Sequence, residues 1–215
     1  MRGVIGLSEA EQDALGEIAN MGVARAAVSL RQLVGSQVLL SVPAVKIVTR
    51  LAASRLVDVG SDSKLVAVQQ AFSGPFSGKA LLIFPAAQSL ELVRSIVGQG
   101  ISLEDVIDLE EEALAETGNI ILNAYMATIA NVLHETLWMT LPSVLRGDGA
   151  ALFEIDDEPK AGDQVLFLYI DFVIKDRDTR GFIALLMDLP AITVLKDIVR
   201  NFLGSLDEQS AANAR

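Results

Sequence analysis

The sequence predicts an α+β fold, in which a mostly antiparallel sheet is flanked by long helices and built from two related halves. Each half opens with a long amphipathic helical pattern, continues with β-branched and alternating runs typical of strands, and closes with a second amphipathic pattern. The chain has 215 residues, of which 51% are hydrophobic. This composition is sufficient for a sizeable core and excludes a disordered or fibrous protein.

The first half begins with a capping box. Ser8 and Glu11 have the spacing at which a hydroxyl and a carboxylate cap the start of a helix, and the helical pattern persists to about Val34, before Gly35. Strands are expected at residues 37–49, 65–72 and 79–84, and a closing helix at residues 86–97, ending at Gly98.

The second half repeats this order. Its first helical pattern opens near Asp108 and runs to about His134. Strands are expected at residues 138–145, 165–173 and 181–187, and a closing helix at residues 190–203, ending at Gly204. We expect Trp138 in the core, Glu110 to Glu112 in the first helical turn, and residues 205–215 as a frayed tail.

The two halves align at an offset of 99 residues. The aligned pairs are Asp13 with Glu112, Ala14 with Ala113, Leu15 with Leu114, Glu17 with Glu116, Asn20 with Asn119, and Pro43 with Pro142. The closing helices align at an offset of 106, so the second copy carries about seven extra residues, which we place in the acidic segment 147–163. Since no long polar linker separates the copies, we expect residues 1–215 to form a single fused domain, with repeats at about 7–98 and 107–204.

Composition excludes several kinds of chemistry. With 17 Lys and Arg against 28 Asp and Glu, the net charge is −11, which excludes a duplex-DNA footprint and disfavours anionic membranes. The absence of cysteine excludes disulfides, zinc thiolate sites and cysteine nucleophiles. The single histidine, His134, is expected to have a structural role at the end of its helix. No apolar stretch reaches the roughly 20 residues of a membrane span, and no signal peptide is evident, so we expect a cytoplasmic protein.

Each of the two long opening helices carries the same polar stripe. At about 100° per residue, Asp13, Glu17 and Asn20 lie within about 60° of one another, opposite the apolar side. Glu112, Glu116 and Asn119 repeat the arrangement on the second helix. The simplest interpretation is an ordinary solvated face. However, the pair has been kept at equivalent positions while neighbouring surface residues have diverged, which favours a functional role.

A carboxamide and a carboxylate three residues apart suit a narrow task. The carboxamide can hold a water molecule in line with an electrophile, but it is a poor base. The carboxylate can bind a cation, such as a lysine of a docked partner. This pair would suffice where the bond to be broken is already labile, as in an acyl phosphate, because positioning and electrostatics dominate phosphoryl transfer.

The run Asp13-x-x-x-Glu17-x-x-Asn20, followed after twenty-two residues by Pro43, resembles the signature of the CheC family of bacterial chemotaxis phosphatases. Its second copy has the same spacing, with Glu112, Glu116, Asn119 and Pro142. The resemblance covers nearly the whole chain, from Leu7 to Gly204, and it includes the internal repeat. It implies a CheC-like fold and hydrolysis of the aspartyl-phosphate on a response-regulator receiver domain, typically CheY.

The same resemblance implies roles for the motif residues. Asn20 and Asn119 would orient the attacking water, and Glu17 and Glu116 would contact a lysine of the regulator. Asp13, Pro43, Glu112 and Pro142 would support the motif. The chain itself would need no cofactor or metal, because Mg²⁺ would belong to the phosphorylated regulator. The receptor deamidase CheD is a possible second partner.

Two alternatives stay open at this point. The first is a non-catalytic module, similar to a flagellar-switch or adaptor protein, that docks a receiver domain or a CheD-type partner without hydrolysis. The second is a metal-dependent hydrolase that uses the acidic clusters.

Overall fold

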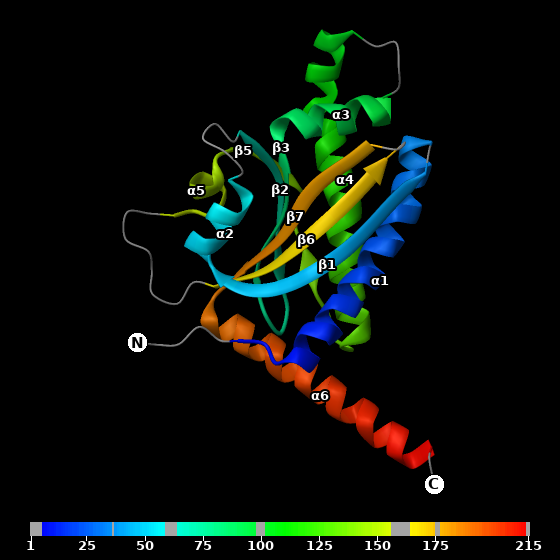
Figure 1. The fold of residues 1–215 in the computed structure, drawn as a ribbon, viewed down its shortest axis with the longest axis vertical. Coiled ribbons are helices and arrows are strands. Elements are labelled where there is room, and N and C mark those ends of the chain that lie inside the picture. The colour runs from blue at the N-terminus through cyan, green and yellow to red at the C-terminus, as the bar shows by residue number, and fades with distance from the viewer. Residues whose placement is uncertain are drawn as a thin grey trace.

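The computed structural model describes residues 6–35, 37–58, 64–97, 102–155, 164–174 and 177–213. It confirms the predicted fold class, because long helices flank a sheet in which every neighbouring pair of strands is antiparallel (Figure 1). The elements in chain order are α1 (Glu9–Val34), β1 (Val38–Thr49), α2 (Arg50–Val57), β2 (Leu65–Ser73), β3 (Gly78–Pro85), α3 (Ala86–Val97), α4 (Leu103–Val132), β4 (Trp138–Met139), β5 (Ser143–Gly147), α5 (Gly149–Leu152), β6 (Gln164–Ile174), β7 (Arg177–Met187) and α6 (Leu189–Asn213).

The strands of the two halves occupy corresponding places on either side of the centre of the sheet. The sheet runs β1-β6-β7-β3-β2, and β4 and β5 both pair with β2 at the far edge. The central pair, β3 and β7, comes one from each half, and each outer strand pairs with a strand of the other half. The halves therefore contribute to one continuous sheet.

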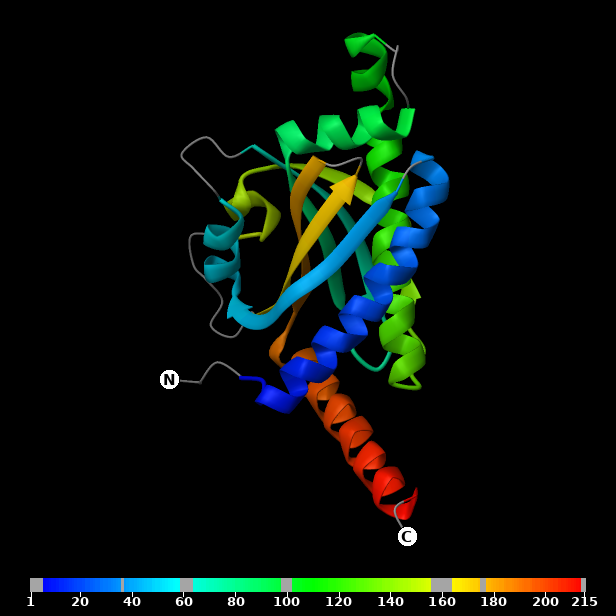
Figure 2. The ribbon, with the colours of Figure 1, turned by 45° about the vertical axis from the view of Figure 1, so that its right-hand side comes forward.

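The sheet is covered on both faces. The main core lies between one face and the helices α1, α3, α4 and α6, and a smaller core lies between the other face and the short helices α2 and α5 (Figures 1 and 2). Alternate residues of β2 point into each core: Val66 and Val68 face the main core, and Leu65 and Ala67 face the smaller one. Burial on both faces explains why the central strands are almost continuously apolar.

The capping box of α1 also ties this helix to α6. The Ser8 backbone N–H donates to the Glu11 carboxylate at 2.8 Å, and the Glu11 N–H donates to the Ser8 hydroxyl at 3.2 Å. Glu11 is 3% exposed and pairs with Arg200 at 3.0 Å and Lys196 at 3.5 Å on α6. Burial would raise the pKa of Glu11, but the Ser8 hydrogen bond and the two cations hold it below its ordinary value of 4.5. Folding therefore favours the ionised carboxylate.

Replacing Glu11 with glutamine is expected to lower the free energy of unfolding by roughly 2 kcal/mol at pH 7. The reason is that the ion pairs with Arg200 and Lys196 are lost and the Ser8 N–H no longer donates to a charged group. Since the pKa of Glu11 is lowered by folding, its contribution is complete above about pH 4.5 and is lost as the pH falls further. The difference between the two proteins in urea unfolding should therefore be constant from pH 7 to about pH 4.5 and shrink as the pH falls below 4.5. A difference that does not shrink below pH 4.5 would contradict the role of the ionised carboxylate.

Several element boundaries differ from the sequence prediction. Helix α4 begins at Leu103 rather than near Asp108, with the Val106 N–H donating to the Ser102 carbonyl. Val106 is 1% exposed in the main core, and this burial favours the additional turn. Glu110 is therefore not in the first turn, and it pairs with Arg146 of β5 at 2.8 Å.

The strand expected at residues 138–145 is interrupted. The Thr140 hydroxyl accepts from the Ala71 N–H at 3.0 Å in place of a backbone carbonyl, and Pro142 has no N–H to donate. The edge is thus divided into β4 and β5. The expectation that Trp138 lies in the core is wrong, because this side chain of the edge strand is 63% exposed.

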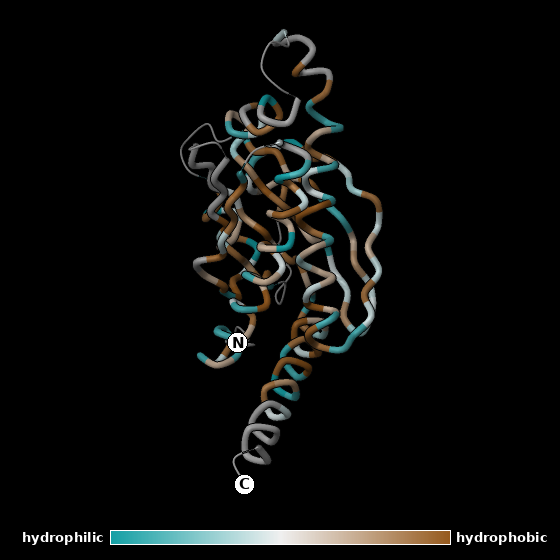
Figure 3. Tube along the Cα trace, turned by 90° about the vertical axis from the view of Figure 1, so that its right-hand side faces the viewer, coloured by the Kyte–Doolittle hydropathy of each residue, from teal (hydrophilic) through white to brown (hydrophobic). Residues whose placement is uncertain are grey.

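The second closing helix is longer than expected. Helix α6 continues through Gly204 to Asn213, so residues 205–213 are helical rather than a frayed tail. Figure 3 shows hydrophobic and hydrophilic residues alternating along the described part of α6 as it leaves the body of the fold. Helices α2 and α5 were not predicted. The predicted helix end at Gly98 and residues 156–163 of the acidic segment lie outside the described residues.

His134 lies at the C-terminal end of α4, as expected. It adopts a left-handed backbone with φ of 55°, and the next N–H, from Glu135, donates to the Ala130 carbonyl at 2.8 Å. This geometry ends the helix in the way that glycine commonly does. Within the described residues, no helix combines the length and the apolarity that a membrane span requires.

Candidate functional site

The two motif-bearing helices, α1 and α4, pack side by side on the same face of the sheet (Figures 1 and 2). Gly22 permits their close approach, because a Cβ at this position would lie 2.9 Å from the Tyr125 Cα. Gly118 brings α4 equally close to β2, where a Cβ would lie 2.4 Å from Val68 Cγ1. Tyr125 is fully buried at the crossing, and this burial raises the pKa of its hydroxyl.

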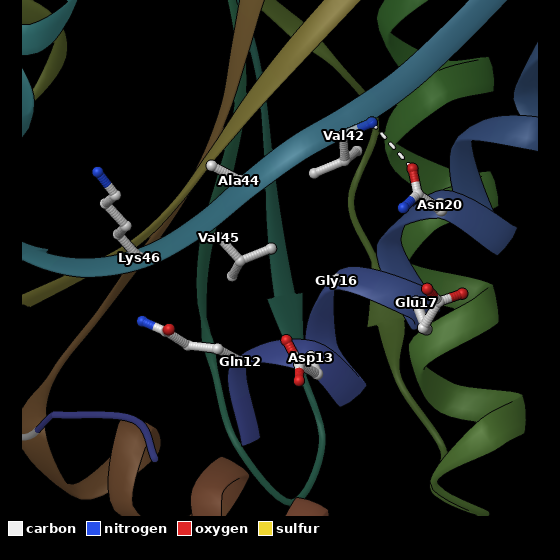
Figure 4. Close-up of a pocket in the computed structure, with 9 residues that line it drawn as sticks. All are labelled: Gln12, Asp13, Gly16, Glu17, Asn20, Val42, Ala44, Val45 and Lys46. Carbon is white, nitrogen blue, oxygen red and sulfur yellow. Dashed lines mark hydrogen bonds between the residues drawn. The ribbon is translucent and has the colours of Figure 1, made fainter. Parts of the chain in front are cut away.

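The first copy of the motif lies along α1 beside β1. Asp13 and Glu17 are exposed, and Asn20 is half-buried. The Asn20 Oδ1 accepts a hydrogen bond from the Val42 backbone N–H at 2.9 Å (Figure 4). Because a backbone N–H can only donate, the carboxamide oxygen must face the strand. The Asn20 NH₂ group is therefore turned away from β1, and no hydrogen bond within the described residues engages it.

A pocket of about 550 Å³ lies between α1 and β1 at this motif. It is lined by Gln12, Asp13, Gly16, Glu17, Asn20, Val42, Ala44, Val45 and Lys46. Lys46 lies on β1 at the end of the pocket away from Asn20 (Figure 4). Its ammonium is 6.0 Å from the centroid of the Tyr169 ring. The aligned residue of the second copy is Leu145. The two copies therefore differ in the residue at this position of the strand.

The second copy of the motif lies on α4. Glu112 and Glu116 are exposed, and Asn119 is half-buried. The Asn119 Oδ1 accepts from Gln70 Nε2 at 3.2 Å and from Asn123 Nδ2 at 2.6 Å. As in the first copy, the carboxamide oxygen is held by the protein. The support differs, because here it comes from two side chains rather than from the backbone.

The structure therefore changes one expectation about the motif residues. The two asparagines do not project freely into solvent. Each is half-buried, with its oxygen in a hydrogen bond to the fold, so the NH₂ group is what each can offer to a bound partner. The two motif prolines lie beside these contacts. Pro43 stands in β1 where the pairing register shifts between Ser41 and Ala44, and Pro142 stands between β4 and β5.

Two residues at the sites were missed in the sequence. Gln70 follows Gln69 in the otherwise apolar first part of β2, and polar residues in a buried strand were a signal that could have been used. Lys46 gave no signal, since its position beside α1 depends on how the helix packs on β1. Among the described residues, no group of three or more acidic or histidine side chains is placed to hold a metal ion.

The chain is similar in sequence to known proteins. Residues 11–47, which contain the first motif, match the CheC-like family. The chain is 27% identical over 144 residues to the CheY-P phosphatase CheC of Bacillus subtilis, a match that covers 65% of this chain and 68% of that protein. These similarities confirm the resemblance inferred from the duplicated motif.

Solved structures share the fold at lower identity. Thermotoga maritima FliY has a TM-score of 0.71 and 16% identity, over 91% of this chain and 98% of that chain. The FliM middle domain of Vibrio alginolyticus has a TM-score of 0.60 and 13% identity, over 86% of this chain and 99% of that chain. These likenesses concern the fold and leave the activity to the site itself.

Proposed function

We propose that this protein hydrolyses the aspartyl-phosphate of a CheY-like receiver domain. The observation that carries the proposal is the repeated placement of a carboxamide NH₂ beside an exposed carboxylate, at Asn20 with Glu17 and at Asn119 with Glu116. The similarity to the CheY-P phosphatase CheC supports the choice of substrate. The same arrangement on two helices gives the protein two candidate sites.

In the proposed reaction, water attacks the phosphorus atom and the bond between phosphorus and the aspartyl oxygen breaks. The products are the free carboxylate of the receiver and inorganic phosphate, and the proton of the water leaves with phosphate or solvent. The asparagine NH₂ donates to the attacking water and fixes its position. Glu17 or Glu116 binds a lysine of the receiver, which sets the register of docking. These contributions are positional, as suits a labile acyl phosphate.

The receiver supplies the remaining chemistry. Mg²⁺ on the receiver neutralises the phosphoryl oxygens, so this chain supplies neither a metal nor a cofactor. Asp13 and Glu112, one helical turn before each glutamate, extend the acidic surface at which the lysine docks. CheD is proposed as a second partner on the basis of the family resemblance.

The test is the decay of acyl phosphate on a purified CheY-like receiver, phosphorylated in the presence of Mg²⁺, with and without this protein. We expect the decay to accelerate in proportion to the concentration of this protein. Unchanged decay with several receivers from chemotaxis circuits would overturn the proposal. The receiver without this protein is the control, because acyl phosphates on receivers hydrolyse spontaneously.

The second candidate function is non-catalytic docking of a phosphorylated receiver. It is favoured by the likeness of the fold to FliY and to the FliM middle domain, which extends over most of each chain. Tight association with the phosphorylated receiver, without faster dephosphorylation, would select this function. The same titration therefore distinguishes the two candidates.

A further inference from the structure

Gln70 is a buried polar side chain directly behind Asn119. It is 1% exposed on β2, and its Nε2 group donates to the Asn119 Oδ1 at 3.2 Å and to the Thr140 carbonyl at 2.8 Å. Its own Oε1 is buried, with no hydrogen-bond partner among the described residues. An unpaired buried oxygen destabilises the fold, so stability would favour an apolar residue here.

The other half of the sheet has such an apolar residue. On β2 the residues that face the main core are Val66, Val68, Gln70 and Phe72, and on β6 they include Leu166, Leu168 and Ile170. These β6 side chains are all aliphatic and at most 2% exposed, so a strand of this sheet can face the main core without a polar residue. Packing of the sheet therefore does not require a polar residue here. Gln70 donates to the Thr140 carbonyl, and beyond this it contacts Asn119, which is the contact that distinguishes the second half.

The orientation of both amides is determined by their partners. The Thr140 carbonyl can only accept, so the NH₂ group of Gln70 lies on the side of Thr140 and Asn119. The Asn119 oxygen then receives two donors, one from Gln70 and one from Asn123, which use both of its lone pairs. Asn119 is left with its NH₂ group as the only donor or acceptor of the carboxamide that can serve a ligand.

The first site reaches the same orientation by another route. The Asn20 oxygen accepts from the Val42 backbone N–H, and this donor does not depend on any side chain. A change of side chain on β2 should therefore disturb Asn119 and leave Asn20 unaffected. This difference between the copies makes the role of Gln70 measurable.

We propose that Gln70 is a positioning residue of the second site, which holds the Asn119 carboxamide with its oxygen inward so that its NH₂ group donates to the attacking water. The proposal rests on the proposed function for its catalytic consequence. Without Gln70, only the Asn123 amide contacts the Asn119 oxygen, and this amide can itself turn over and present its own oxygen. The Asn119 carboxamide can then rotate, and a half-turn would present an acceptor where the site requires a donor. Loss of this alignment lowers the rate of the chemical step rather than the affinity for the receiver.

The test places Gln70→Met in two backgrounds. With Asn20→Ala, only the second site remains, and Gln70→Met is expected to lower kcat by about tenfold with little change in KM. With Asn119→Ala, only the first site remains, and the same change should alter kcat by less than about twofold. A general loss of folded protein would reduce both. Equal effects in the two backgrounds, or no effect in either, would overturn the positioning role.

A spectroscopic measurement decides the positional claim without reference to activity. In NMR spectra of the full chain, Gln70→Met is expected to shift the side-chain NH₂ and Cγ signals of Asn119 and to leave those of Asn20 in place. Unchanged Asn119 signals would overturn the claim even if the enzyme is active. If the wild-type protein accelerates no receiver's dephosphorylation, the proposed function fails, and the NMR result still decides whether Gln70 fixes Asn119.

Discussion

Replacing both Asn20 and Asn119 with aspartate is expected to reduce the acceleration of receiver dephosphorylation by at least about a hundredfold. Aspartate has nearly the same shape as asparagine, and its carboxylate can still accept from Val42, Gln70 and Asn123. The change removes only the outward NH₂ donors and adds negative charge beside the phosphoryl group. The loss should therefore appear in kcat/KM while the midpoint of urea unfolding stays close to that of the wild type.

The alanine variants are a less clean comparison, and the structure shows why. Asn20→Ala leaves the Val42 N–H without its hydrogen bond, which should cost about 1 kcal/mol of stability in addition to any loss of activity. Each single aspartate variant is expected to retain activity from the other site. A double variant that keeps the wild-type rate would show that neither asparagine acts in the reaction, and the site assignment would then be wrong.

The fold was predicted best where local signals determine an element. The start of α1 at Ser8 and its end at Gly35 follow from a capping box and a glycine with φ of 64°. The start of α3 agrees for a related reason, since β3 ends at Pro85 and the amphipathic pattern begins at the next residue, Ala86. The interruption between β4 and β5 could not be predicted, because it depends on Thr140 replacing a backbone partner of Ala71, a residue far away in the sequence.

The candidate sites were predicted only in part. The internal repeat was sufficient to select Glu17 with Asn20 and Glu116 with Asn119. The same two residue types occur at equivalent positions of both repeats, which distinguishes them from surface residues that differ between the repeats. The contacts that orient the asparagines link residues 22 and 49 positions apart. Such contacts depend on how α1 and α4 pack on the sheet. A helical period places Asn119 on a face of α4, but it does not say which strand residue lies beneath that face.

Replacing Gly118 with alanine is expected to lower the free energy of unfolding by about 3 kcal/mol, because the new methyl group would overlap a stiff, buried side chain. The added Cβ would lie 2.4 Å from Val68 Cγ1 and 2.5 Å from Val68 Cβ, and Val68 is 1% exposed. Helix α4 must then move away from β2, which also separates Asn119 from Gln70. Urea unfolding measures the first effect, and the NMR signals of Asn119 report the second.

Gly16→Ala provides the matched control. Gly16 also lies inside a long helix, but a Cβ there would meet nothing within 4 Å. The same substitution should therefore stabilise the protein by about 0.5–1 kcal/mol, through helix propensity.

The overlap itself is tested by adding Val68→Ala to Gly118→Ala. Val68→Ala removes two of the three atoms that the new Cβ would overlap and leaves only the Cβ of residue 68. The overlap is thus partly relieved, so the double variant should be more stable than the sum of the single effects predicts. Strictly additive effects would mean that the close approach of α4 to β2 at Gly118 does not limit the packing. In that case, the position of Asn119 over Gln70 would have to depend on other contacts of α4.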